Sequence, residues 1–395
     1  MTDEKTPGNV GRSGPLAGLK VVEMAGIGPG PFACMVLADH GAEVIRVDRI
    51  PRADPSEFAK TANRPSIVDR GRSSIAVNMK DPRGVALALD LIATADVLVE
   101  GYRPGVMERL GLGPAECLQR NARLVYGRMT GWGQSGPLAQ TAGHDINYIA
   151  LTGALHAMGP ADRPPSPPLN LVGDYGGGGM LLAFGVLAAV LEARSSGHGQ
   201  VVDAAMSDGA ALLMAPIYGM LARGAWTDAR EQNFLDGAAH FYGTYRCSDG
   251  GYLAVGPIEP QFYRLLLELC EVRDSDFSAQ WDRARWTGLR KKLEGVFASR
   301  TRDQWSALLE GTDACVAPVL SMQEAPLHPH NQARRTFDSS RGAWEPAPAP
   351  RFERTPSSLP PPAPDLGGQS RAILRGLGHE DSAIDGLLAA GVIHT

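Results

Sequence analysis

The first half of this chain alternates short apolar segments with segments of helical pattern, and this alternation limits the fold most. Apolar segments of strand length occupy residues 19–24, 43–48, 74–79, 96–100, 124–129 and 200–204. Helical patterns lie between most of them, and one opens at Asp81-Pro82, where proline at an early helical position costs no hydrogen bond. Strands separated by helices pair in parallel through right-handed crossovers. We therefore expect an α/β fold with a Rossmann-like parallel sheet.

The sequence changes character after residue 240, which predicts a second, smaller α+β domain. Residues 241–246 and 252–256 flank the pair Asp249-Gly250, which is typical of a β-hairpin turn. Helical patterns follow at residues 261–270 and 302–310. Residues 345–368 contain eight prolines and little apolar periodicity. We expect this last segment to run extended along the surface.

Composition excludes several classes of protein. The net charge is -5, so the chain lacks the basic excess of a general nucleic-acid binder. Its five cysteines are scattered without a CxxC pair, which favours reduced thiols of a cytoplasmic protein over disulfides or a zinc site. The longest apolar run, Met180–Leu191, is too short to span a bilayer. We predict no membrane span and interpret this run as a buried helix.

One stretch, from Arg46 to Arg83, is locally basic. It carries nine Lys and Arg against five Asp and Glu, a balance of +4 in a chain of net -5. A solvated charged face explains such a stretch as well as a functional site does. The functional interpretation is a site for a phosphorylated ligand, because guanidinium groups bind phosphate in a bidentate way.

The turn Gly26–Pro31 follows the first expected strand and invites comparison with a dinucleotide-binding loop. Asp48 ends the next strand, where a ribose-binding acid would stand. However, the spacing is not GxGxxG, and Pro29 and Pro31 remove two N–H groups that would hold a pyrophosphate. We therefore favour a structural or substrate-facing turn over an NAD or FAD site.

His144 and Asp174 are the candidate catalytic residues. An imidazole and a carboxylate can share the removal and return of a proton, since both can be tuned toward working pH. Each also has an ordinary interpretation: His144 as a structural histidine, and Asp174 as the N-cap of a helix. Four glycines, Gly176–Gly179, follow Asp174, and we expect them to let a ligand approach the backbone closely. Glu259 either caps a helix or reaches the active cleft from another domain or subunit.

Taken together, these residues resemble a known family. The chain is similar to the α-methylacyl-CoA racemases of the class III CoA-transferase superfamily over about residues 14–355. The segments that carry the resemblance are Gly18–Glu23, Gly41–Arg49, Glu100–Gly105, Gly131–Gln134, Gly143–Tyr148, Asp174 with its glycines, and Ile258–Phe262.

The resemblance implies an interlocked homodimer of two-domain subunits. We assign residues 14–203 to a large CoA-binding Rossmann-like domain, 204–240 to a helical linker and 241–335 to a small α+β domain. Residues 336–395 return to complete the large domain. Each active site would lie between the large domain of one subunit and the small domain of the other.

The resemblance also assigns roles. It implies that His144 and Asp174 interconvert (R)- and (S)-2-methylacyl-CoA by 1,1-proton transfer through an enolate, and that Glu259 hydrogen-bonds the histidine from the partner subunit. Coenzyme A is part of the substrate, and neither metal nor redox cofactor is needed. The implied coenzyme A contacts are Arg49, Arg70, Arg72, Lys80, Arg109, Asp145 and Tyr148.

Some features depart from the family pattern. His240 and Pro257 stand where other residues are usual, and both flank the segment that carries Glu259. The loop from Pro51 to Asp69 is longer than usual. The main alternative is a CoA-transferase of the same superfamily, in which Asp174 is a nucleophile. A non-catalytic acyl-CoA binder and a Rossmann oxidoreductase also remain open, as do the acyl group and the role of His240.

Overall fold

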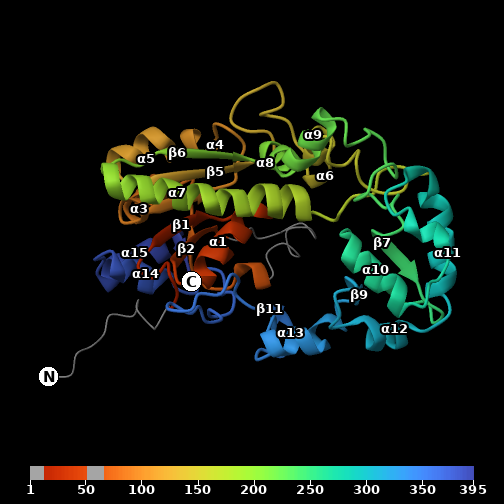
Figure 1. Ribbon diagram of the computed structural model, residues 1–395. Helices are drawn as coiled ribbons and strands as arrows, with labels where there is room; N and C mark the ends of the chain where they lie inside the picture. The colour runs from red at the N-terminus through yellow and green to blue at the C-terminus, as the bar shows by residue number, and fades with distance from the viewer. Residues whose placement is uncertain (1–12, 51–65) are drawn as a thin grey trace. The chain divides into compact units, whose positions relative to one another are not determined.

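A computed structural model describes residues 13–50 and 66–395, and the chain divides into two units (Figure 1). Unit 1 contains the described residues up to Thr152, together with Leu169–Leu213 and Glu345–Thr395. Unit 2 contains Gly153–Pro168 and Met214–Trp344. The division differs in detail from the predicted domains, because residues 153–168 fold with unit 2 and the predicted linker is shared between both units.

Unit 1 is built on a seven-stranded sheet in the order β12-β3-β2-β1-β4-β5-β6. Six strands pair in parallel, as the alternation predicts, and the short β12 is antiparallel to β3. The expected α/β fold with a large parallel sheet is confirmed. The strands are β1 (Lys20–Met24), β2 (Glu43–Arg49), β3 (Arg72–Val77), β4 (Val97–Glu100), β5 (Val125–Thr130), β6 (Val201–Ala205) and β12 (Ile393–His394).

Helices cover both faces of this sheet. Because side chains alternate along a strand, neighbours such as Val21 and Val22 enter opposite cores. The Val21 core lies under α1 (Pro29–Asp39) and α7 (Leu181–Ser196), and Figure 1 shows α7 running along the sheet. The opposite core lies under α3 (Pro82–Ala93), α5 (Pro114–Arg120), α14 (Ser370–Gly376) and α15 (Asp381–Ala389).

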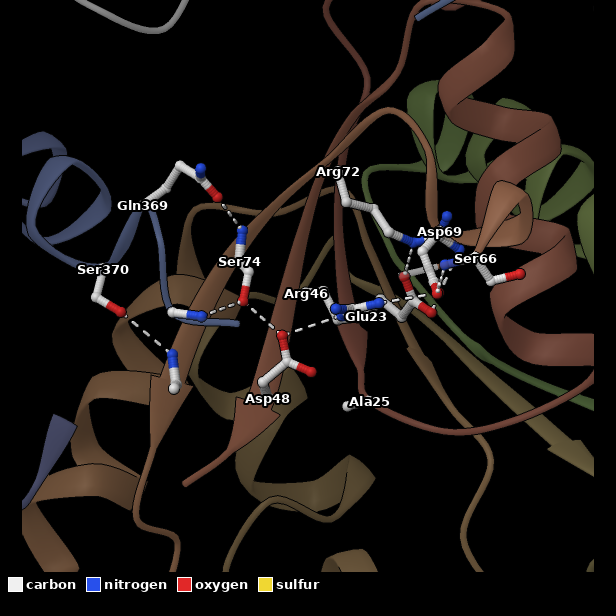
Figure 2. A network of polar contacts seen from close by, with 12 residues as sticks. Glu23, Ala25, Arg46, Asp48, Ser66, Asp69, Arg72, Ser74, Gln369 and Ser370 are labelled. Atoms are coloured by element: carbon white, nitrogen blue, oxygen red, sulfur yellow. Dashed lines mark hydrogen bonds and ion pairs between the residues drawn. The ribbon is translucent and has the colours of Figure 1, made fainter. Parts of the chain in front are cut away.

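Backbone N–H groups of β3 donate hydrogen bonds to side chains of the C-terminal segment and hold this segment against the sheet (Figure 2). The Ser74 N–H donates to Gln369 Oε1 at 2.9 Å, and the Ala76 N–H donates to Ser370 Oγ at 3.2 Å. Since α14, α15 and β12 all lie in this segment, residues far apart in sequence build one sheet and one core. A short strand, β11 (Glu345–Pro346), marks where the chain re-enters unit 1.

The apolar helix of the middle region has two parts. Leu171–Met180, labelled η2, is π-helical and continues directly into α7. Within the described residues, the continuous helix Leu171–Ser196 alone is long and apolar enough to cross a membrane. Half of its most apolar stretch is buried inside the protein. Because α7 covers the sheet, we interpret it as a core helix. The predicted helical linker begins with two helices, α8 (Met206–Leu213) and α9 (Ala215–Ala222), which are separated at Met214.

Unit 2 contains the predicted hairpin, extended by a third strand. β7 (Gly243–Arg246) and β8 (Tyr252–Val255) are antiparallel, and β9 (Val316–Pro318) pairs with β8. A core rich in aromatic residues packs on this sheet. Its helices are α10 (Pro260–Leu269), α11 (Trp286–Phe297), α12 (Arg302–Leu309) and α13 (Pro329–Arg334), and a short strand β10 (Phe337–Asp338) follows.

Candidate active site

The candidate site lies at the carboxyl ends of the parallel strands, where the chain order reverses. The chain proceeds from β1 outward to β3 on one side, and from β4 to β6 on the other. The turn Gly26–Pro31 follows β1, and the segment Gly101–Gly105 follows β4. The Tyr102 hydroxyl joins the two by donating to the Ala25 carbonyl at 3.2 Å. In open α/β sheets, ligands bind at such a switch point.

Asp174 lies in η2, and its side chain is half-buried. The Asn170 side-chain amide donates to Asp174 Oδ2 at 3.0 Å. The backbone of the first turn lies against the same oxygen, since a Cβ atom on Gly28 would stand 3.5 Å from it. Gly28 has φ 72°, a conformation that favours glycine, and it precedes α1. The turn therefore faces the candidate catalytic carboxylate, as the substrate-facing interpretation expects.

His144 immediately precedes α6 (Asp145–Ala150) and is exposed. Its backbone N–H donates to Asn147 Oδ1 at 3.0 Å, which fixes the start of the helix. The next residue, Asp145, is buried, and its Oδ1 accepts the N–H of Asp174 at 2.7 Å. This bond joins the segment that carries the imidazole to the segment that carries the carboxylate.

The environment of Asp174 favours its protonated form. Burial raises the pKa of Asp174, and the nearby Asp145 charge raises it further, while the Asn170 hydrogen bond and the His144 charge lower it. The net direction is upward. The interaction with His144 also shows that the two candidate groups lie within electrostatic reach of each other. Asp174 is thus a carboxyl group suited to act as an acid as well as a base.

The glycines after Asp174 have a different role from the one expected. A Cβ on Gly177 would meet the Ala210 nitrogen at 2.6 Å, and one on Gly179 would meet the Pro29 carbonyl oxygen at 2.8 Å. A Cβ on Gly209 would in turn stand only 1.9 Å from the Gly177 oxygen. The expectation that these glycines admit a ligand is therefore wrong for Gly177 and Gly179. They let η2 pack closely against α8 and α1.

Tyr148 is buried beside the same helix start. Its hydroxyl donates to the Gly143 carbonyl, and its ring packs edge-on against Trp132 with centroids 4.8 Å apart. Burial and the Asp174 charge raise the pKa of Tyr148, while Arg103 lowers it. Gly131 leaves room for this ring, since a Cβ there would stand 2.1 Å from it. Tyr148 thus stabilises the loop that presents His144.

Arg70 and Arg72 bind protein acceptors inside unit 1. Arg70 is buried and donates to both Asp39 oxygens, at 2.8 and 2.6 Å, and to Glu345 at 3.0 Å. Arg72 donates to Glu23 Oε2 at 2.5 Å (Figure 2). It also donates to three backbone carbonyls. The phosphate contacts assigned to these two arginines stay predictions, and a phosphate would compete with buried ion pairs.

The remaining cations of the basic stretch fall into three groups. Arg46 pairs with Asp48 at 3.0 Å and with Asp69 at 2.9 Å, and the exposed Arg83 pairs with Asp81 at 2.8 Å. Arg49, Lys80 and Arg109 are exposed and form no ion pair with another described residue. Arg49 is the last residue of β2, Lys80 follows β3, and Arg109 ends the short helix α4 (Val106–Arg109) after β4. Arg49 also stacks 5.0 Å over the Tyr102 ring. Arg52, Lys60 and Arg64 lie outside the described residues, together with residues 51–65 of the predicted long loop.

Glu259 belongs to unit 2, where it is exposed and immediately precedes α10. Its carbonyl accepts the Tyr263 N–H at 3.0 Å. The Gln280 amide donates to the carbonyls of Pro257 and Ile258, at 3.2 and 2.9 Å. The segment that ends in Glu259 is thus rigidly held, while its carboxylate remains exposed.

His240 has a structural environment in unit 2. It is fully buried, its Nε2 lies 2.7 Å from the Tyr263 hydroxyl, and that hydroxyl donates to the Phe277 carbonyl. Burial and the Arg290 charge lower the pKa of His240 to about 4. The imidazole is therefore neutral at pH 7 and belongs to the core of unit 2.

Sequence reasoning missed two residues of unit 1. Asn170 stands four residues before Asp174, a spacing that brings side chains together on a helix, so a signal was present. Glu100 is buried at the end of β4, where burial raises its pKa to about 7 despite the Tyr102 N–H and Arg128. Arg128 lies opposite Glu100 in register, and that pairing depends on the sheet.

Two further facts bear on cofactor and redox chemistry. Within residues 13–50 and 66–395, no three His, Cys, Asp or Glu side chains form a group able to hold a metal ion. All five cysteines are free.

Comparison with known proteins agrees with this geometry. The model of CoA-transferase family III matches residues 16–370. The chain is 43% identical to alpha-methylacyl-CoA racemase of Mus musculus over 373 residues, covering 93% of this chain and 95% of the relative. It is 44% identical to alpha-methylacyl-CoA racemase of Homo sapiens over 345 residues, 87% of each chain. A crystal structure of a CAIB/BAIF family protein from Brucella suis has a TM-score of 0.78 at 25% identity, covering 93% of this chain and 100% of that one. The predicted resemblance is confirmed, and this chain belongs to CoA-transferase family III.

Proposed function

We propose that this protein is a racemase that interconverts (R)- and (S)-2-methylacyl-CoA thioesters. The observation that carries the proposal is the joining of two segments. Asp174, whose pKa is raised, hydrogen-bonds the residue that follows His144 and interacts with the His144 charge. These contacts support a pair of proton-exchanging groups at the switch point of the sheet.

The reaction moves one proton off the α-carbon and one proton onto it. His144 takes the α-proton of the S isomer, and the C–H electron pair moves into the thioester carbonyl to form an enolate. Protonated Asp174 donates its proton to the opposite face, and the carbonyl re-forms as the R isomer. The two groups exchange roles in the reverse direction, so one group must hold a proton while the other is free to accept one.

The enolate oxygen needs donors in its vicinity, because stabilising developing negative charge is often the largest catalytic contribution. The Asp174–Gly178 segment has few N–H groups to offer, because it is π-helical and its Tyr175 N–H donates to the Asn170 carbonyl at 3.4 Å. The N–H of Asp174 itself is engaged by Asp145. Neither a metal nor a redox cofactor takes part in the proposed reaction.

Coenzyme A supplies binding energy away from the reacting carbon. We propose that its phosphates bind exposed cations at the carboxyl edge of the sheet, foremost Arg49, Lys80 and Arg109. Arg70, Arg72, Asp145 and Tyr148 complete the proposed contact set. The exposed Arg49 ends β2 and the exposed Lys80 follows the neighbouring strand β3, which supports a shared phosphate site.

We further propose a homodimer in which Glu259 of the partner subunit orients His144. Unit 1 exposes large apolar side chains that a monomer would leave in water, among them Phe184 at 70% and Leu191 at 69% exposure, seven residues apart on α7. Leu212 on α8 is 61% exposed. Such apolar exposure is typical of an interface. The five free cysteines support a cytoplasmic location.

The test is α-proton exchange in heavy water with no CoA acceptor present. A racemase incorporates deuterium at the α-carbon of 2-methylacyl-CoA, and the Asp174→Ala variant loses racemisation. A panel of branched fatty, sterol side-chain and arylpropionyl thioesters identifies the acyl group. Transfer of CoA to an added free acid, without deuterium exchange, would establish a CoA-transferase with Asp174 as nucleophile instead.

A further inference from the structure

Asp145 is a buried carboxylate beside the reacting groups, and its contacts within unit 1 suit it for a role beyond binding coenzyme A. Its Oδ1 accepts the Asp174 N–H at 2.7 Å. Its Oδ2 is buried and has no hydrogen-bond partner among residues 13–50 and 66–395. No ion pair involves Asp145 in the described part of the chain, in contrast to the buried carboxylates Asp39 and Glu23, which pair with arginines.

We propose that Asp145 is a positioning residue for the proton transfer, which holds the Asp174 backbone to the start of α6 and places a second negative charge beside its carboxylate. This inference rests on the proposed racemase function. It goes beyond the coenzyme A contact that the family resemblance implies for the same residue.

The positioning part follows from the chain path. Asp145 is covalently next to His144, and its hydrogen bond reaches Asp174 twenty-nine residues later. One side chain therefore sets the spacing of the two proton-transfer groups. Gly173 permits the contact, because a Cβ there would stand 2.3 Å from Asp145 Oδ1. A displacement of about 1 Å in such an arrangement lowers the rate by about 100-fold.

The role of the Asp145 charge follows from which group must hold a proton before the reaction begins. Conversion of the S isomer must begin with Asp174 protonated, and a neighbouring negative charge favours that form. The groups that act on the Asp174 carboxyl are the Asp145 charge, the His144 charge, the neutral Asn170 amide and the nearby Tyr148 ring. Among them Asp145 is the group whose negative charge raises the pKa of Asp174. Asp145 thus offsets the effect of His144.

Two substitutions separate the two parts. Asp145→Asn keeps an oxygen to accept the Asp174 N–H but removes the charge. We expect it to retain racemisation of 2-methyldecanoyl-CoA within about 10-fold of wild type, with the acid limb of its pH profile moved about one unit lower. Asp145→Ala removes both functions, and we expect kcat to fall about 100-fold with KM changed less than about threefold.

A third substitution disturbs the hydrogen bond between Asp145 and the Asp174 N–H from the Asp174 side. Gly173→Ala displaces the Asp145 carboxylate without altering its charge, so we expect the kcat loss of Asp145→Ala without the shift in pH profile. The control is Asp96→Asn. Asp96 also accepts a backbone N–H from another element, that of Lys20 at 2.8 Å, but stands at the amino end of the sheet. Its pH profile should equal that of wild type.

The outcomes are distinguishable. An unmoved acid limb in Asp145→Asn would overturn the charge part, and a raised KM with unchanged kcat in Asp145→Ala would make the residue a coenzyme A ligand only. Wild-type protein that shows no racemisation at all would instead reject the proposed function. Melting temperatures of each variant confirm that the folded protein is being compared.

Discussion

Asp39 and Asp174 are two carboxylates of unit 1 that have opposite environments. Asp39 is buried, and the guanidinium of Arg70 binds both of its oxygens. Asp174 is half-buried, receives one hydrogen bond from a neutral amide, and has no arginine partner among the described residues. A carboxylate locked in an ion pair stabilises the fold but cannot exchange a proton easily. Partial burial without a cation is what makes Asp174 suited to chemistry.

The largest expected effect is on the reaction itself. Asp174→Asn preserves shape but removes the titrating group, and we expect racemisation to fall about 10³-fold. Melting temperature should change little, since Asp174 holds no ion pair. Chiral analysis of 2-methylacyl-CoA after incubation measures the loss. Retention of most activity would mean that another group protonates the second face.

Removing the arginine partner of Asp39 should act on stability instead of on the reaction. Arg70→Ala leaves Asp39 buried without its guanidinium, so we expect about 3 kcal/mol less free energy of unfolding. Chemical denaturation measures it, with Arg83→Ala as the matched surface pair, for which we expect no measurable change. A normal stability with a strongly raised KM for CoA thioesters would show that Arg70 serves the ligand.

The Asn170 hydrogen bond sharpens the comparison within the active site. It lowers the pKa of Asp174, so its removal should raise that pKa and move the acid limb of the pH profile to higher pH. For Asn170→Ala we expect this shift together with about a 10-fold lower kcat. Gln140→Ala, which removes an exposed amide donor bound to the Pro104 carbonyl, is the control. An unchanged profile would mean that the amide does not act on Asp174.

A smaller effect on stability should distinguish the buried His240 from the exposed His198. Burial lowers the pKa of His240 to about 4, below its value in an unfolded chain of about 6.5. The unfolded state therefore binds the proton first, and stability present above pH of about 6.5 is lost as pH falls toward about 4. His240→Gln should weaken this pH dependence of unfolding, while the exposed His198→Gln should not. Equal curves for both variants would contradict the assignment.

Sequence reasoning reached the local features and missed those that depend on distant partners. The sheet was predictable because apolar residues such as Val21 and Val22 form compact runs between helices. The ion pair of Arg70 with Glu345 joins residues 275 apart, and no local pattern reports it. The close packing of Gly177 against Gly209 was hidden for the same reason. The two candidate catalytic residues were identified by chemistry and family resemblance, whereas the link through Asp145 required the fold.

The most direct test follows each enantiomer separately in heavy water. If His144 and Asp174 serve opposite faces, Asp174→Asn should still exchange the α-proton of the S isomer through His144, and should leave the R isomer unexchanged. His144→Gln should show the reverse preference. Loss of exchange from both isomers to the same extent in both variants would contradict the assignment of one base to each face.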